Sequence, residues 1–183
     1  MKQILFVHSA GTQGSHEGSG DLIANLKAAL GSEYSFIVPM MPEPERPTYQ
    51  AWSMKLREKL EALSGEVLLA GHSLGGSVLL KFLSEHSVSN RISGLFVLAA
   101  PFWGKDSDWL SDEFELPERF PLRLAQIPHL YFYHSRDDAV VPFRHMQLYA
   151  EYLPHAQFRE LDHFGHFFRV PCRQLIDDIL AIK

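Results

Sequence analysis

The chain has 183 residues, 46% of them hydrophobic and 21% charged, which is typical of one soluble globular domain, 1–183, and not of a disordered or membrane-spanning chain. A formal net charge of −5, with no long lysine or arginine run, gives no general attraction to nucleic acid. The sole cysteine, Cys172, cannot form an intramolecular disulfide, and the apolar run at 4–7 is too short for a signal peptide, so we expect a cytoplasmic protein.

Short apolar runs typical of buried strands alternate along the chain with segments of helical spacing. In chain order the pattern predicts strand 4–7, helix 21–30, strand 34–38, helix 49–63, strand 67–70, helix 75–85, strand 92–99, strand 130–133, helix 142–152, a weaker strand 157–161 and helix 171–182. Pro142 and Pro171 are suited to first helical turns. This alternation predicts an α/β fold, a three-layer α/β/α sandwich whose doubly wound, mostly parallel sheet has about six strands.

One segment, 102–128, fits neither the helical nor the strand period. It is long for a connection within a compact domain, and such segments are often functional. Its aromatic residues include Phe102 and Trp103, which are candidates for binding a substrate beside the nucleophile described next. The alternative is that these rings seal an edge of the core, because aromatic side chains dominate core burial.

The stretch 67–76 places the pattern G-x-S-x-G between a predicted buried strand and a predicted helix, with Ser73 at its centre. In a sharp strand-to-helix turn, the glycines on either side of the serine leave room for a strained backbone and expose the serine oxygen above the sheet. The nearby helix N-terminus favours the negative charge that develops in acyl transfer. Ser73 is therefore a candidate nucleophile, the alternative being a helix-capping serine in a glycine-rich turn.

A serine nucleophile needs a base and an acid that orients the base, and in this fold they follow it in the order serine, acid, histidine. The loop after strand 130–133 carries Asp137 and Asp138, and the loop after 157–161 carries His163 and His166. Both loops come in the expected order. Spacing alone does not separate the two adjacent aspartates.

Four short motifs together make the chain resemble the α/β hydrolases, and in length and spacing the small serine hydrolases of the retinoblastoma-binding protein 9 and YdeN family. They are His8-Ser9-Ala10-Gly11, Gly71-His72-Ser73-Leu74-Gly75-Gly76, Asp138 four residues before Pro142, and Gly165-His166-Phe167. The resemblance implies Ser73 as nucleophile, Asp138 as acid and His166 as base. It leaves Asp137 and His163 as neighbours.

The same resemblance implies an oxyanion hole formed by the backbone NH groups of Leu74 and Ala10. The family usually carries His-Gly at the end of the first strand, where this chain has His8-Ser9, so a different backbone path is expected there.

These residues favour a serine hydrolase that cleaves a carboxylic ester of a small-molecule acyl substrate. A peptidase or thioesterase would use the same groups, and a protein-interaction module on a retained hydrolase fold, with a protein partner, is a further alternative. A flavodoxin-like domain would leave the serine turn unexplained. The glycine-rich stretch 11–20 lacks the phosphate-binding patterns G-x-G-x-x-G and Gly-Lys-Ser/Thr, and no metal-ligand motif is present, so no cofactor or metal is expected.

Overall fold

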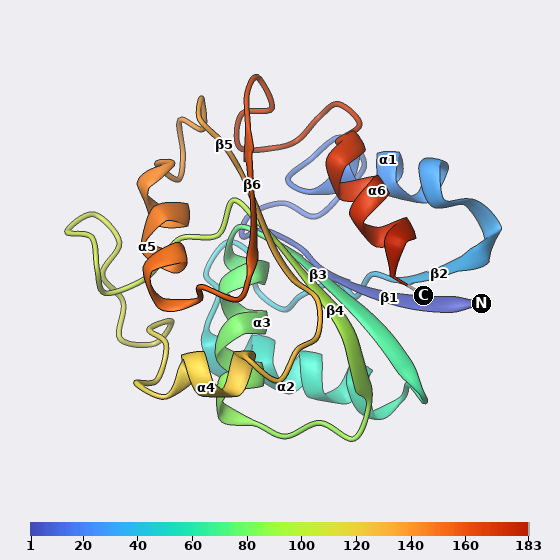
Figure 1. Cartoon of the computed structure of the whole chain (residues 1–183), viewed down its shortest axis with the longest axis horizontal. Coiled ribbons are helices and arrows are strands. Elements are labelled where there is room, and N and C mark those ends of the chain that lie inside the picture. Colours follow the sequence, from blue (N-terminus) through green and yellow to red (C-terminus); the bar gives the residue numbers. More distant parts are fainter. Residues whose placement is uncertain (183) are drawn as a thin grey trace.

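The computed structural model describes residues 1–182 and alternates strands with helices (Figure 1). In chain order the elements are β1 (Lys2–Val7), α1 (Gly20–Leu30), a 3₁₀ turn (Gly31–Glu33), β2 (Tyr34–Ile37), α2 (Tyr49–Glu61), β3 (Glu66–His72), α3 (Leu74–Glu85), β4 (Arg91–Leu98), α4 (Phe120–Leu124), β5 (Leu130–Ser135), α5 (Arg144–Tyr152), β6 (Gln157–Leu161) and α6 (Arg173–Ala181). All six predicted strands are present.

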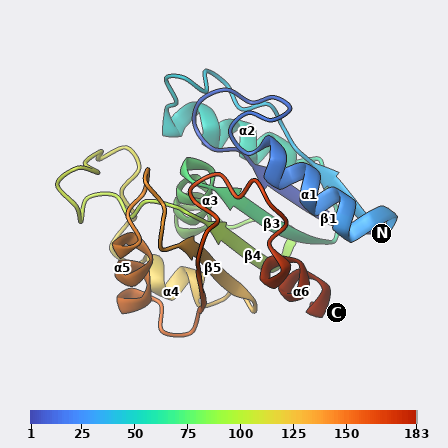
Figure 2. The same ribbon diagram turned by 90° about the horizontal axis from the view of Figure 1, so that it is seen from above.

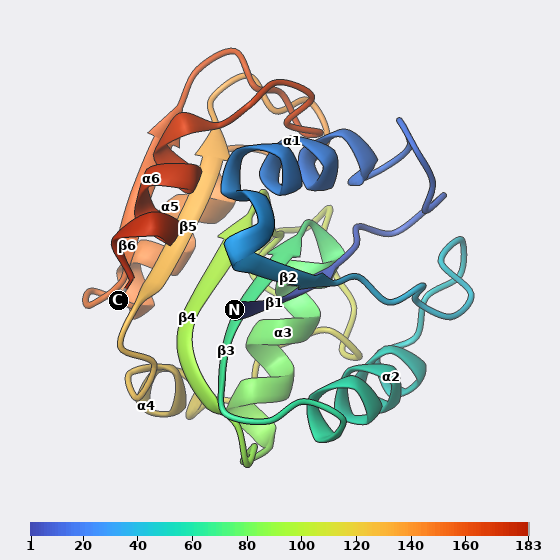
Figure 3. The same cartoon turned by 90° about the vertical axis from the view of Figure 1, so that its right-hand side faces the viewer.

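The six strands form one sheet in the order β2-β1-β3-β4-β5-β6, and every neighbouring pair is parallel (Figure 3). The chain order reverses between β1 and β3, where ligands bind in open α/β sheets. Because parallel strands end at the same edge, the segments that follow β1, β3, β4, β5 and β6 gather there. The predicted three-layer sandwich with a parallel sheet is confirmed.

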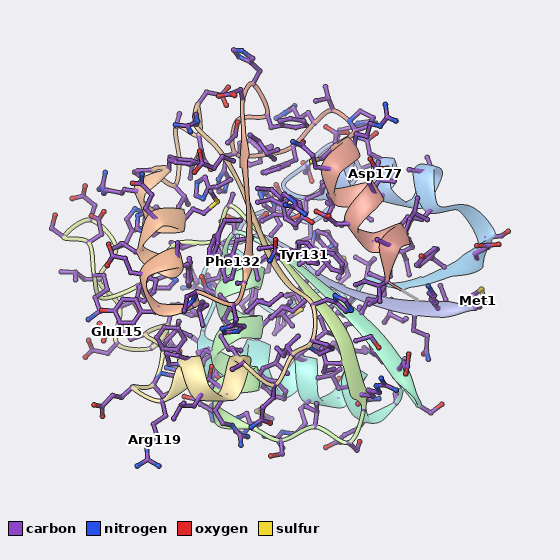
Figure 4. All side chains as sticks on the ribbon, in the orientation of Figure 1. Met1, Glu115, Arg119, Tyr131, Phe132 and Asp177 are labelled. Atoms are coloured by element: carbon purple, nitrogen blue, oxygen red, sulfur yellow. The ribbon has the colours of Figure 1, made fainter. Side chains whose placement is uncertain are left out.

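Helices cover both faces of the sheet because successive strand residues point to opposite sides. One apolar cluster joins alternate strand residues to α2, α3, α4 and α5, and a second joins the intervening residues to α1 and α6. Tyr131 and Phe132, neighbours on β5 in Figure 4, illustrate the alternation, since Phe132 belongs to the first cluster and Tyr131 packs against the second. Strands buried on both faces explain the continuous apolar runs in the sequence.

The structure differs from the sequence prediction at several boundaries. Helix α5 begins at Arg144 and α6 at Arg173, so Pro142 and Pro171 precede these helices and do not lie in their first turns. The segment 102–128 contains the helix α4, which was not predicted because five residues are too few for a helical period to show. The preceding stretch is an irregular loop beside α5 (Figures 1 and 2).

Among residues 1–182, no helix has the length and apolar character needed to cross a bilayer.

Candidate active site

Ser73 lies at the turn between β3 and α3 with a backbone φ of 53° and ψ of −121°. A positive φ is costly for a residue with a Cβ atom and persists only where the surrounding structure imposes it. The Ser73 NH donates to the carbonyl of Leu98 on β4 at 2.8 Å, which holds this turn to the sheet. The strained turn expected from the G-x-S-x-G pattern is therefore present.

Two glycines of that pattern are required by close backbone packing. A Cβ atom on Gly71 would lie 2.7 Å from the backbone of Gly75, and one on Gly75 would lie 2.3 Å from the carbonyl oxygen of Val7 at the end of β1. Each distance is far below van der Waals contact, so a side chain at either position would push α3 away from the sheet. The glycines thus allow the start of α3 to sit directly against β1 and β3.

His166 and Asp138 come together from the loops that follow β6 and β5. His166 Nδ1 lies 2.8 Å from Asp138 Oδ2, and both side chains are buried, at 5% and 0% exposure. Because an ionised carboxylate can only accept hydrogen bonds, Nδ1 carries the proton, and Nε2 has a free lone pair when the imidazole is neutral. His166 and Ser73 line the same cavity.

Asp138 is surrounded by donors, which explains its state of charge. Its Oδ1 accepts the NH groups of Val140 and Val141, each at 2.8 Å. Nε2 of the buried His134, which donates to the Val141 carbonyl at 2.8 Å, also lies 3.2 Å from Asp138 Oδ2. Burial acts to raise the pKa of Asp138, but the hydrogen bonds from His134 and His166 outweigh it and hold this pKa well below its usual range. The carboxylate therefore stays ionised near neutral pH. The role of His134 was not foreseen, because nothing local in the sequence marks it.

Asp137 makes different hydrogen bonds from its neighbour Asp138. Its Oδ1 accepts the Ser135 hydroxyl and, at 3.1 Å, the NH of Gly165, so it links the β5 loop to the β6 loop next to His166. These donors hold the pKa of Asp137 below its usual range. The side chain of His163 is exposed. In the structure it is Asp138, and not Asp137, that contacts His166.

A cavity of about 270 Å³ opens at this edge of the sheet. Its lining residues are Ser9, Ala10, Pro47, Ser73, Leu74, Pro101, Trp103, Trp109, Phe114, Val140, His166 and Phe167. Trp103 thus lies where a substrate contact was predicted. Phe102 does not, because its ring is 2% exposed and packs against Tyr149 and Phe120 in the core. The alternative interpretation, a core seal, holds for Phe102.

The two residues predicted to form an oxyanion hole, Ala10 and Leu74, both line the cavity. Leu74 begins α3, and the first NH groups of a helix have no partner within it. Ser9 stands where the family usually has a glycine, and its backbone φ is not positive. The positive φ in this loop falls on Gly11, two residues later, at 84°. A serine therefore fits at this position without backbone strain.

A buried hydrogen-bond network runs behind the nucleophile. His72 Nε2 lies 2.7 Å from the His166 carbonyl, which can only accept, so Nδ1 accepts from the Ser19 hydroxyl at 2.9 Å. Ser19 Oγ in turn accepts the Ser9 NH at 2.9 Å. The network joins the loops after β1 and β6 to the serine turn. Its partners are distant in sequence, and only the position of His72 beside Ser73 could have hinted at it.

The state of His72 leads to a prediction about stability. Burial, and then the nearby His166 imidazole, lower the pKa of His72 to about 3. His72 therefore takes up a proton near pH 6.5 in the unfolded chain but only near pH 3 in the folded chain. Its stabilising contribution is fully present above pH 6.5 and is lost as the pH falls toward 3. As the pH falls from 6.5 to 4.5, we expect protonation of this residue to lower the free energy of unfolding by an amount on the order of 2 kcal/mol. Urea unfolding across this range measures it.

A substitution isolates the contribution of His72. His72→Gln should make the pH dependence of the unfolding free energy shallower, whatever its absolute stability, because the titrating group is gone. His129→Gln, which removes an exposed histidine, is the matched control and should keep the wild-type slope. An unchanged slope in His72→Gln would contradict the prediction.

Comparison with known proteins agrees with this architecture. A model of the serine hydrolase family matches residues 36–169. The putative hydrolase YdeN of Bacillus subtilis (strain 168) is 26% identical over 128 residues, which cover 69% of this chain and 67% of that protein. The crystal structure of the B. subtilis ydeN gene product has a TM-score of 0.83 at 22% identity, covering 100% of this chain and 98% of that one. The esterase domain of a Rhodothermus marinus protein has a TM-score of 0.63 at 18% identity, covering 97% and 80%.

The parallel sheet and these structural neighbours define a minimal α/β-hydrolase fold. Because the family model spans most of its length, the chain belongs to the serine hydrolase family. The resemblance to YdeN-like hydrolases is thereby confirmed, and the protein is a hydrolase.

Proposed function

We propose that this protein hydrolyses carboxylic esters, with Ser73 as nucleophile, His166 as general base and Asp138 as the acid that orients His166. One observation carries the proposal: Ser73 and His166 line one cavity while Asp138 holds the opposite nitrogen of His166 at 2.8 Å. That arrangement directs the lone pair of Nε2 away from the acid and toward the cavity.

In the first half of the reaction, His166 Nε2 takes the Ser73 hydroxyl proton as Oγ attacks the ester carbonyl. The backbone NH groups of Leu74 and Ala10 stabilise the oxyanion. Collapse of the intermediate breaks the bond to the alcohol, which leaves with the proton from His166.

In the second half, His166 removes a proton from water as the water attacks the acyl-enzyme, and Ser73 recovers its proton when the acid leaves. One ester and one water thus give one acid and one alcohol. Asp138 stabilises the imidazolium formed in both halves without becoming protonated.

A fluorophosphonate probe tests the nucleophile. We expect covalent labelling of the purified protein at Ser73, located by mass spectrometry of the labelled peptide, because the probe reacts with activated serines. Ser9 lines the same cavity and serves as an internal control that should remain unlabelled. A label elsewhere, or none on folded protein, would contradict the proposal.

Matched butyryl compounds test the bond that is cleaved. With p-nitrophenyl butyrate, a butyryl thioester and butyryl p-nitroanilide, we expect the oxygen ester to have the highest kcat/KM. The esterase domain among the structural neighbours supports this choice. Faster cleavage of the anilide or of the thioester would assign the protein to the peptidases or thioesterases instead.

A further inference from the structure

Part of the cavity wall is aromatic and uncharged. Trp103, Trp109 and Phe114 line it, and no lysine, arginine, aspartate or glutamate is among the described residues around it. Its volume of about 270 Å³ is slightly below the roughly 300 to 1,000 Å³ usual for drug-sized ligands. The cavity is therefore suited to a small, neutral group of about the size of one ring.

The three aromatic residues form a cluster with internal packing. The ring of Trp103 lies 5.2 Å from that of Trp109, nearly perpendicular to it, and 5.3 Å from that of Phe114. Trp103 Nε1 also donates to the Ser77 hydroxyl on α3 at 3.1 Å. Such edge-on and tilted contacts stabilise aromatic clusters beyond simple burial. One end of the wall is thus attached to the helix that begins next to Ser73.

The other end is attached to α5 through Asp106. The Asp106 carboxylate, 6% exposed, pairs with the guanidinium of Arg144, which lowers the pKa of Asp106 to about 2. His145 Nδ1 accepts the NH of Phe102 at 3.0 Å, so its Nε2 carries the proton. This Nε2 makes no hydrogen bond to the described residues and lies 3.5 Å from a carboxylate oxygen of Asp106. The ring of Trp109 lies edge-on to His145, with ring centres 5.6 Å apart. The Trp109 NH donates to the Asp106 carbonyl at 3.0 Å, so Asp106 joins the wall to Arg144 at the start of α5 and lies beside His145.

We propose that the site selects neutral esters carrying a ring-sized apolar group, and that Asp106 is the positioning residue that holds the aromatic wall for that group. This inference rests on the proposed function for its chemistry.

The physical reason is desolvation. A ring entering the cavity exchanges water for aromatic contacts, whereas a carboxylate or ammonium would lose its hydration with no opposite charge to replace it. Selectivity against charge therefore follows from the lack of lysine, arginine, aspartate and glutamate among the described lining residues. Selectivity for a ring follows from the volume of the cavity and its aromatic lining.

Two comparisons among esters test the substrate class. Methyl 4-methylpentanoate and monomethyl succinate have similar shapes and differ in charge, and we expect the neutral ester to have a kcat/KM higher by about tenfold or more. Methyl phenylacetate and benzyl acetate carry a ring on the acyl or the alcohol side, and the better of them should exceed methyl acetate by a similar factor. Equal kcat/KM for the neutral and the charged ester would overturn the selectivity against charge. A kcat/KM for methyl acetate equal to that of the better ring-bearing ester would overturn the selectivity for a ring.

Asp106→Asn tests the positioning role, with Asp108→Asn as the matched control. Asp108 lies in the same loop, is 79% exposed and approaches Arg144 only at 3.9 Å. Asp106→Asn should raise KM for the preferred ring-bearing ester by roughly fivefold or more and change kcat/KM for methyl acetate by less than about twofold. Asp108→Asn should change neither. Equal losses for both esters in Asp106→Asn would mean a general structural role and overturn the assignment.

Binding measurements separate this inference from the proposed function. Calorimetric titration of Ser73→Ala with methyl phenylacetate, benzyl acetate and monomethyl succinate measures recognition without turnover. Preferential binding of a ring-bearing ester supports the inference even if the wild-type protein hydrolyses none of them, in which case the proposed function alone fails. Hydrolysis of all of them with no binding preference overturns the inference and leaves the proposed function standing.

Discussion

Ser73→Ala is expected to abolish ester hydrolysis, lowering kcat by up to ~10⁶, the loss seen when the nucleophile of a well-studied protease triad is removed. The reason is that the proposed mechanism needs a hydroxyl at the turn between β3 and α3, and Ser73 supplies the one at that position. Steady-state hydrolysis of p-nitrophenyl butyrate measures the effect.

Folding should be unaffected by this change. Alanine meets the same positive φ as serine, and the Ser73 NH keeps its bond to the Leu98 carbonyl, so the thermal unfolding midpoint should match that of the wild type. Residual turnover above roughly a hundredth of wild type, in folded protein, would show that Ser73 is not the nucleophile.

Asp138→Asn is expected to lower kcat by ~10⁴, the loss found for the same change in a protease triad. The Asp138 carboxylate accepts a hydrogen bond from the Nδ1–H of His166, which leaves Nε2 without a proton and able to act as a base. An asparagine can present an NH₂ group to Nδ1, which favours the tautomer with its proton on Nε2, and that tautomer cannot take the serine proton. Rates at saturating ester measure the effect.

Asp137→Asn is the matched control, since it removes the same charge one residue earlier. Asp137 Oδ1 only accepts, from Gly165 NH and the Ser135 hydroxyl, and an asparagine carbonyl oxygen can accept both bonds, although more weakly than a carboxylate. Its turnover should therefore remain close to wild type. If Asp137→Asn is the inactive variant and Asp138→Asn turns over normally, the assignment of the acid is wrong, although Ser73 and His166 keep their proposed roles.

The sequence alone did not determine which residues of 102–128 line the cavity. The aromatic content of 102–128 indicated a functional segment, and Trp103 does line the cavity. Its neighbour Phe102 turns into the core, where its NH meets His145. Adjacent residues in an irregular loop have no fixed period, so composition does not determine which of them faces a cavity. The ion pair between Asp106 and Arg144 joins residues 38 positions apart, and no local pattern marks it.

The order of strands and helices and the identity of the serine turn could be predicted from the sequence by itself. Buried parallel strands require continuous apolar runs, and the close approach of α3 to β1 and β3 requires Gly71 and Gly75, so both leave local traces. Only the tertiary structure decided which carboxylate contacts His166, because Asp137 and Asp138 lie in one turn and differ only in the direction of their side chains. It likewise decided the network of His72 with Ser19, whose bond joins residues 53 positions apart. Such contacts depend on how packed elements are oriented, and the sequence of a single loop does not contain that information.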